Sequence, residues 1–159
     1  MDDVRWLEPE ELRAWIMLAK LLFLMPSALD GQLTRDADLN MGDYMVLAIL
    51  SNEPGPALRM SELAVRAGCS QSRLSRIVGR LERADLVQRT MSPDDRRVVM
   101  AELTETGVRR IAAAAPGHLR EVRRLVFDRL SDEQVQMLAE VGEALLGQDA
   151  LPPPPRSPK

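Results

Sequence analysis

SQSRLSRIVGRLERA, residues 70–84, is the stretch that decides how this chain folds. Its apolar residues recur at the i, i+3, i+4, i+7 spacing of one helix face; they are Leu74, Ile77, Val78 and Leu81. Four arginines, at positions 73, 76, 80 and 83, follow a second face. Because Ser70 is a favourable N-cap, we predict an amphipathic helix over residues 71–84 with an arginine-rich outer face.

A short helix precedes this segment and a hairpin follows it. Ser61 can cap a helix over residues 62–67, and the turn 67–70 is short enough for a helix-turn-helix corner. Residues 86–91 and 97–103 are predicted to be strands. Two strands do not form a stable sheet alone, so they must lean on the preceding helices. The pattern predicts a mainly α fold with a small β-hairpin wing, in which a winged helix-turn-helix lobe occupies residues 43–104.

Helices are predicted on both sides of this lobe. Residues 9–25 have helical apolar spacing, and Pro26 is expected to kink or end that helix. Asp43 is expected to cap the next one, which carries apolar residues up to position 50. Thr104 can cap a helix from residue 105, which Pro116 and Gly117 are expected to interrupt.

Ser131 opens a capping box with Gln134, which predicts a last helix ending near residue 146. The chain is therefore divided into four parts: an N-terminal helix of a helical dimerisation lobe (1–35), the winged lobe (43–104), C-terminal dimerisation helices (105–147), and a Pro-rich tail expected to be disordered (148–159).

The charge of the chain is unevenly distributed. The 159 residues have a formal net charge of −3 and a pI of about 5.3, which by itself argues against a nucleic-acid partner. Residues 57–110, however, contain eleven arginines and seven acidic residues, a net charge of +4, which leaves −7 for the rest. Aromatic residues make up only 3%, so single-strand binding by base stacking is disfavoured. A basic lobe on an acidic body suits duplex DNA.

Composition excludes several other classes. One cysteine and one histidine exclude a Cys/His zinc site and an intramolecular disulfide, and leave little catalytic machinery, so we expect neither an enzyme nor a bound cofactor or metal. The acidic start is unlike a signal peptide. The longest uninterrupted apolar run, residues 21–26, is far shorter than the roughly 18 residues of a membrane span. A cytoplasmic protein without a membrane partner is expected.

Candidate DNA contacts concentrate in two places. The N-terminal end of a recognition helix enters the major groove, where Ser, Gln and Arg can bond base edges or phosphates; the residues there are Ser70, Gln71, Ser72, Arg73, Ser75 and Arg76. Arg59, Arg80 and Arg83 are candidates for phosphate contact. At the hairpin tip Arg96 and Arg97 can reach a minor groove, with Asp95 positioned to pair with Arg97. The alternatives are a solvated arginine face and an ordinary polar turn.

The residues of this block resemble the MarR family of transcriptional regulators. The likeness rests on RMSELA (59–64), SRLSRIV (72–78), RLE (80–82), the wing signature DRR (95–97) and LTETG (103–107), and it extends over about residues 11–146. It implies a homodimer whose terminal helices interlock and whose recognition helices and wings bind a pseudo-palindromic DNA site. Two positions depart from the family pattern: Asp85 stands where glycine is usual, and Pro116-Gly117 should bend the fifth helix.

The flanking helices independently favour a dimer. Apolar stripes run along residues 11–33 and 118–146, and one small lobe could not bury all of them. Intramolecular packing is the alternative.

The resemblance further implies a small aromatic or anionic effector bound between the lobes, whose binding releases DNA. Candidate wall residues are Trp15, Ala19, Leu22, Met41, Tyr44, Met45 and His118, and for each of them a place in the plain core is the alternative. Two alternatives stay open for the function as a whole. One is a winged-helix protein-interaction module that does not bind DNA. The other is a redox-responsive regulator that uses Cys69, since a helix N-terminus can lower a thiol pKa.

Overall fold

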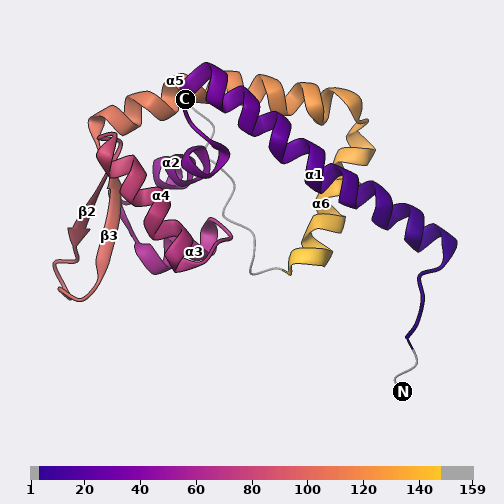
Figure 1. The fold of residues 1–159 in the computed structure, drawn as a ribbon, viewed down its shortest axis with the longest axis horizontal. Helices are drawn as coiled ribbons and strands as arrows, with labels where there is room; N and C mark the ends of the chain where they lie inside the picture. The colour runs from indigo at the N-terminus through magenta and orange to yellow at the C-terminus, as the bar shows by residue number, and fades with distance from the viewer. Residues whose placement is uncertain (1–3, 148–159) are drawn as a thin grey trace.

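The computed structural model describes residues 4–147, which form helices and one small sheet (Figure 1). In chain order the elements are α1 (Pro9–Ala37), α2 (Met41–Asn52), β1 (Ala57–Arg59), α3 (Met60–Arg66), α4 (Gln71–Arg83), β2 (Val87–Met91), β3 (Val99–Leu103), α5 (Glu105–Leu125), the 3-10 turn η1 (Phe127–Arg129) and α6 (Asp132–Leu146). The tail predicted to be disordered, residues 148–159, lies outside the described residues.

Helices α2, α3 and α4 pack with the sheet to form one lobe (Figure 1). The sheet is antiparallel with strand order β1-β3-β2, so the short β1 joins the predicted hairpin as its third strand. Fully buried leucines and valines from every layer meet inside, among them Val46, Leu63, Leu74 and Val87. The mainly α winged helix-turn-helix fold predicted from the sequence is confirmed.

Three of the predicted N-caps are confirmed and two are wrong. Ser70, Thr104 and Ser131 each cap the expected helix. Asp43 does not cap α2: Asn40 does, three residues earlier, and Asp43 is its capping-box partner. Ser61 does not cap α3 either, because β1 carries the chain straight into a helix that begins at Met60.

Neither internal proline ends its helix, although the sequence allowed Pro26 to end α1 and predicted that Pro116 and Gly117 would interrupt α5. Helix α1 continues through Pro26 and α5 continues through Pro116. A proline removes one backbone hydrogen bond, and packing of the helix against a neighbour can offset this loss. The end of α1 that follows Pro26 packs against α5, where Gln32 lies beside Gly117, and this contact supports α5 around Pro116. The part of α1 before Pro26 is almost wholly exposed and remains helical without such a contact.

Parts of α1 and α6 extend away from the winged lobe (Figure 1). The apolar side chains on these parts are uncovered. Phe23 is 82% exposed and Leu145 is 67% exposed. One 18-residue window of α1 has a mean hydropathy of 1.5, and none of it is buried, so by length and composition alone α1 could cross a membrane. The sequence argument counted uninterrupted apolar residues, whereas this average also includes the polar and charged residues between them.

Candidate nucleic-acid interface

Helix α4 offers a buried apolar side and an exposed polar side. Leu74, Ile77, Val78 and Leu81 are all buried, as the spacing predicted. Ser70 begins the helix, and its hydroxyl accepts a hydrogen bond from the Arg73 backbone N–H at 3.3 Å. The six residues predicted for the major groove are all exposed around this N-terminal end; they are Ser70, Gln71, Ser72, Arg73, Ser75 and Arg76. The structure thus brings them together on one surface.

The corner before α4 is set by a glycine. Gly68 has a φ of +60°, in the left-handed region that glycine adopts without strain. The Gly68 N–H donates to the Val65 carbonyl at 3.0 Å, and the Cys69 N–H donates to the Ala64 carbonyl at 3.1 Å, so the chain turns tightly out of α3. This turn sends α4 off in a new direction with its N-terminus exposed.

The hairpin between β2 and β3 projects from the side of this lobe as a wing (Figure 1). The Arg97 backbone N–H donates to the Asp95 carboxylate at 2.9 Å, which braces the tip. The predicted ion pair between these two side chains is present at 3.9 Å, and the Arg97 side chain is 95% exposed. Arg96 is also exposed. Asp95 therefore shapes the turn, and both arginines reach outward.

A crowded corner attaches the wing to α5. Asp85 has a φ of +56°, the conformation that glycine adopts freely, and the Thr104 hydroxyl donates to its carbonyl at 2.6 Å. Gly107 lies so close to the backbone of Leu86 that a Cβ at position 107 would overlap the Leu86 carbonyl oxygen. These contacts give physical reasons for the Leu-Thr-x-x-Gly pattern and for the glycine that is usual at position 85.

The arginines predicted to contact phosphates have different surroundings. Arg59 is exposed at the start of α3. The Arg83 Nε donates to the Gly79 carbonyl at 3.1 Å and remains exposed. Arg80 instead binds the buried carboxylate of Asp43 on α2. Its Nη2 donates to Asp43 Oδ1 at 2.6 Å, and its Nε donates to the same oxygen at 3.0 Å. Sequence reasoning missed this pair, because the two residues lie 37 positions apart and Asp43 was assigned to a cap.

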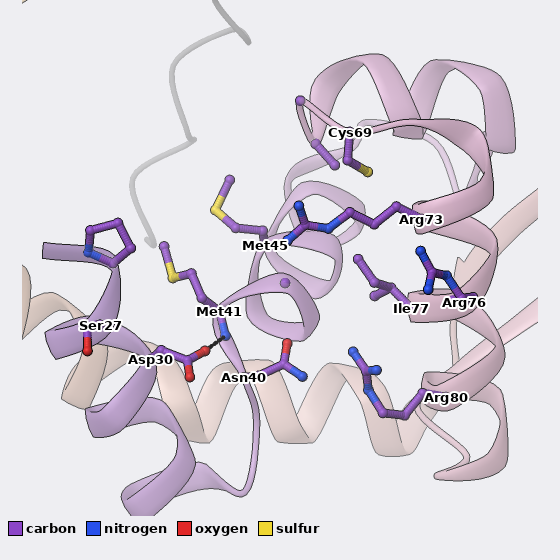
Figure 2. A pocket seen from close by; sticks show the side chains of 14 residues that line it. Ser27, Asp30, Asn40, Met41, Met45, Cys69, Arg73, Arg76, Ile77 and Arg80 are labelled. Atoms are coloured by element: carbon purple, nitrogen blue, oxygen red, sulfur yellow. Dashed lines mark hydrogen bonds between the residues drawn. The ribbon is translucent and has the colours of Figure 1, made fainter. Parts of the chain in front are cut away.

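A cleft of about 910 Å³ separates α1 from α4. Figure 2 shows Ser27 and Asp30 of α1 on one side and Arg73, Arg76 and Arg80 on the other. Apolar and sulfur-bearing side chains line the rest, namely Pro26, Met41, Met45, Cys69 and Ile77. A hydrogen bond of 2.7 Å from the Met41 backbone N–H to the Asp30 carboxylate joins α1 to the first turn of α2. The cleft therefore combines a cationic wall with an adaptable apolar lining.

The structure divides the seven predicted effector-binding residues among separate places. Only Met41 and Met45 line this cleft. Trp15 and Ala19 line a shallow hollow further along α1, and Leu22 is exposed on the same helix. Tyr44 and His118 are buried in the core, with their ring centroids 4.2 Å apart.

Burial changes the acidity of this aromatic pair. It raises the pKa of the Tyr44 hydroxyl and lowers the pKa of the His118 imidazole, because both charged forms are poorly solvated there. Within the described residues, His118 Nδ1 and Gln32 Oε1 are buried without a hydrogen-bond partner. His118 is therefore a neutral core residue. Over residues 4–147, no three His, Cys, Asp or Glu side chains gather where they could hold a metal ion.

Comparison with known proteins places this arrangement among DNA-binding regulators. A model described as the MarR family matches residues 37–98. The chain is 40% identical to Sco3205, a MarR family transcriptional regulator from Streptomyces coelicolor solved in complex with DNA; the match covers 94% of this chain and 96% of Sco3205, with a TM-score of 0.86.

Two further relatives carry regulator names. One is the HTH-type transcriptional regulator YfiV of Bacillus subtilis (strain 168), 32% identical over 137 residues, which are 84% of this chain and 81% of YfiV. The other is the HTH-type transcriptional repressor IacR of Pseudomonas putida, 33% identical over 118 residues, which are 72% of this chain and 66% of IacR.

Proposed function

The chain belongs to the MarR family of transcriptional regulators, and on that premise we propose that it is a sequence-specific double-stranded DNA-binding repressor. The observation that carries this function is the exposed N-terminal end of α4, where serine, glutamine and arginine side chains gather beside an arginine-tipped wing. Sco3205, which shares the fold and 40% of its residues, was solved with DNA. The name of IacR supports repression as the mode of action.

We propose that α4 reads the major groove while the wing follows the adjacent minor groove. Ser70, Gln71, Ser72, Arg73, Ser75 and Arg76 then face base edges and nearby phosphates. Arg96 and Arg97 enter the minor groove, where a narrow groove concentrates negative potential. Arg59 and Arg83 contact the phosphates of the DNA backbone or steer the approach of DNA through their charge.

The working unit is a homodimer. The uncovered apolar faces of α1 and α6 support it, since monomeric soluble proteins rarely leave such continuous patches exposed. Two-fold pairing is the commonest arrangement of soluble oligomers, and it places two recognition helices on a pseudo-palindromic site. Pairing in this way also covers the apolar window of α1 without a membrane, as a cytoplasmic protein requires.

A mobility-shift titration on the DNA that flanks this protein's own gene tests the proposal. We expect a retarded complex whose affinity falls steeply with salt, because phosphate contacts release counterions. Scrambled DNA of equal length serves as the control. Absence of any shift at low salt would contradict the function, and binding of another protein with a flat salt response would favour a protein-interaction module.

The cleft between α1 and α4 is the proposed place for an effector that releases DNA. Arg73 and Arg76 supply positive charge, while Met41 and Met45 offer an adaptable apolar lining, so an organic anion with an apolar body fits. Repeating the titration with aromatic acids tests this site. A Met45→Trp variant, which narrows the cleft without altering any of the six residues proposed for the major groove, should still bind DNA yet lose the response. Unchanged release by that variant would place the effector elsewhere.

A further inference from the structure

The contact between Arg80 and Asp43 joins the recognition helix to α2. The Arg80 Nε lies 3.0 and 3.2 Å from the two carboxylate oxygens, and its Nη2 lies 2.6 Å from Oδ1. Two nitrogens of one planar guanidinium therefore hold one carboxylate, a geometry that fixes orientation as well as distance. Asp43 is 5% exposed, whereas the Arg80 side chain is 45% exposed.

Asp43 is itself held rigidly. Its backbone N–H donates to the Asn40 side chain at 2.9 Å, and its carboxylate accepts from the Asn40 backbone N–H at 3.4 Å. The same first turn of α2 is tied to α1 through the hydrogen bond between Met41 and Asp30. Arg80 is therefore anchored to a fixed point rather than to a mobile surface carboxylate.

The other arginines that share the cleft wall are placed differently. Among residues 4–147, the side chains of Arg73 and Arg76 take part in no ion pair and remain exposed. They are thus available to DNA, while the donors of Arg80 that face α2 are already engaged. The apolar face of α4 sets roughly which side faces the core, and Arg80 adds a directional contact that fixes its rotation and its position along α2.

We propose that Asp43 is a positioning residue for DNA recognition, which keeps Arg80 on α2 so that the N-terminal end of α4 meets the bases in register. This inference rests on the proposed DNA-binding function and revises the role expected for Arg80, which becomes an internal anchor rather than a phosphate contact. Base readout is sensitive to small displacements of the reading side chains, whereas non-specific attraction to phosphates is not.

The opposite arrangement makes different predictions. If Arg80 left Asp43 to bind a phosphate, its removal would lower the slope of log affinity against log salt by about 0.9. A lysine at position 80 would largely replace it, because phosphate accepts a point charge. If Asp43 merely withheld Arg80 from DNA, Asp43→Asn would tighten binding and steepen that slope.

The experiment compares Asp43→Asn, Arg80→Lys, Arg80→Gln and the Asp43→Asn/Arg80→Gln double variant with the parent. Each variant is titrated, over a range of salt concentrations, against the duplex that flanks the protein's own gene (the target) and against a scrambled duplex of equal length. Stoichiometric titration gives the active fraction of each preparation. Arg76→Gln is the matched control for loss of an exposed arginine on the same helix face. Circular dichroism melts check folding, and Arg80→Lys keeps the test available if Asp43→Asn does not fold.

We expect Asp43→Asn, Arg80→Lys and Arg80→Gln each to lose about ten-fold or more in target affinity, with the affinity for the scrambled duplex and the salt slope unchanged. The double variant should be no weaker than either single, because both remove the same contact. Arg76→Gln should lower the slope and weaken both duplexes. An Arg80→Lys variant that binds like the parent, a slope lowered by Arg80→Gln, or tighter binding by Asp43→Asn would each overturn the proposal. A parent chain that binds neither duplex would instead refute the proposed function.

Discussion

The lack of a side chain at Gly107 allows two parts of the molecule, α5 and the base of the wing, to pack closely. Gly107 sits in the first turn of α5, where a side chain would overlap the carbonyl oxygen of Leu86 at the base of the wing. Thr104, which caps the same turn, also donates to the Asp85 carbonyl at 2.6 Å. The base of the wing is therefore held against α5 by the Thr104 hydrogen bond and by a close backbone contact that leaves no room for a side chain at position 107.

We predict that Gly107→Ala lowers the free energy of unfolding by about 1–3 kcal/mol, because the new methyl group must push the backbone of Leu86 aside. Urea denaturation followed by circular dichroism measures the change. Gly142→Ala in α6 is the matched control, since a Cβ there meets nothing within 4 Å and alanine is the better helix former. Equal stability of the two variants would contradict the close contact.

His118 predicts a distinct dependence of stability on pH. Burial lowers its pKa in the folded chain, whereas the unfolded chain keeps the ordinary value of about 6.5. Below about pH 6.5 the unfolded chain binds a proton at His118 that the folded chain does not. The contribution of His118 to the free energy of unfolding therefore decreases as the pH is lowered from about 7.5 to the folded pKa, and it is constant above about pH 7.5.

Denaturation midpoints of the parent and a His118→Gln variant between pH 8 and pH 5.5 isolate this contribution. Carboxylates contribute equally to both proteins, so the difference between the two curves belongs to His118. We expect the parent to lose more stability than the variant as the pH falls below 6.5. Parallel curves would show that His118 is not buried in its neutral form.

The side chains at the tip of the wing are exposed to solvent. We predict that Arg97→Ala weakens binding to target DNA at least ten-fold while leaving the melting temperature within a degree or two of the parent, since the side chain is 95% exposed and pairs only loosely with Asp95. Fluorescence anisotropy and thermal melts measure the two effects. Arg120→Ala, an exposed change on α5, controls for loss of charge. DNA binding equal to the parent's would remove the wing from the interface.

Elements with strong local signals could be predicted from the sequence. Helix α4 shows why: its apolar spacing, its Ser70 cap and its arginine face all agree, and the structure confirms each. Strand β1 gives no such signal, because three residues are too few for an alternating pattern and only pairing with β3 makes them a strand. The interruption predicted at Pro116 was wrong because local propensity cannot include the packing of α5 against α1. Helix α1 continues through Pro26 although the side chains before it are exposed.

The candidate site divides in the same way. Exposure of the residues at the start of α4 followed from helical geometry, because they lie opposite a recognisable apolar face. The attachment of Arg80 to Asp43 did not, since it joins two helices far apart in the chain. Tyr44 and His118 were proposed as ligand contacts because aromatic residues with polar tips suit such a role, but tertiary packing buries them against each other.

For the molecule as a whole, the uncovered faces of α1 and α6 are the surfaces proposed to pair in the dimer. We predict that Leu138→Glu converts the proposed dimer to a monomer, because an interface that closes over this half-exposed leucine would have to bury an unpaired charge. Analytical ultracentrifugation measures the mass. Gln136→Glu, an exposed change on a different face of α6, should stay dimeric. A parent chain that sediments as a monomer would contradict the dimer and leave the apolar face of α1 for another partner.

The same faces tie folding to the abundance of the protein. In the proposed dimer, Phe23 and Leu145 are shielded from water only when two chains meet, so stability follows mass action and the melting temperature rises with protein concentration. A growing cell that halves its stock of repressor then loses folded protein as well as binding partners for its DNA sites. Occupancy falls more steeply than dilution alone requires, which makes the chain responsive to its own copy number.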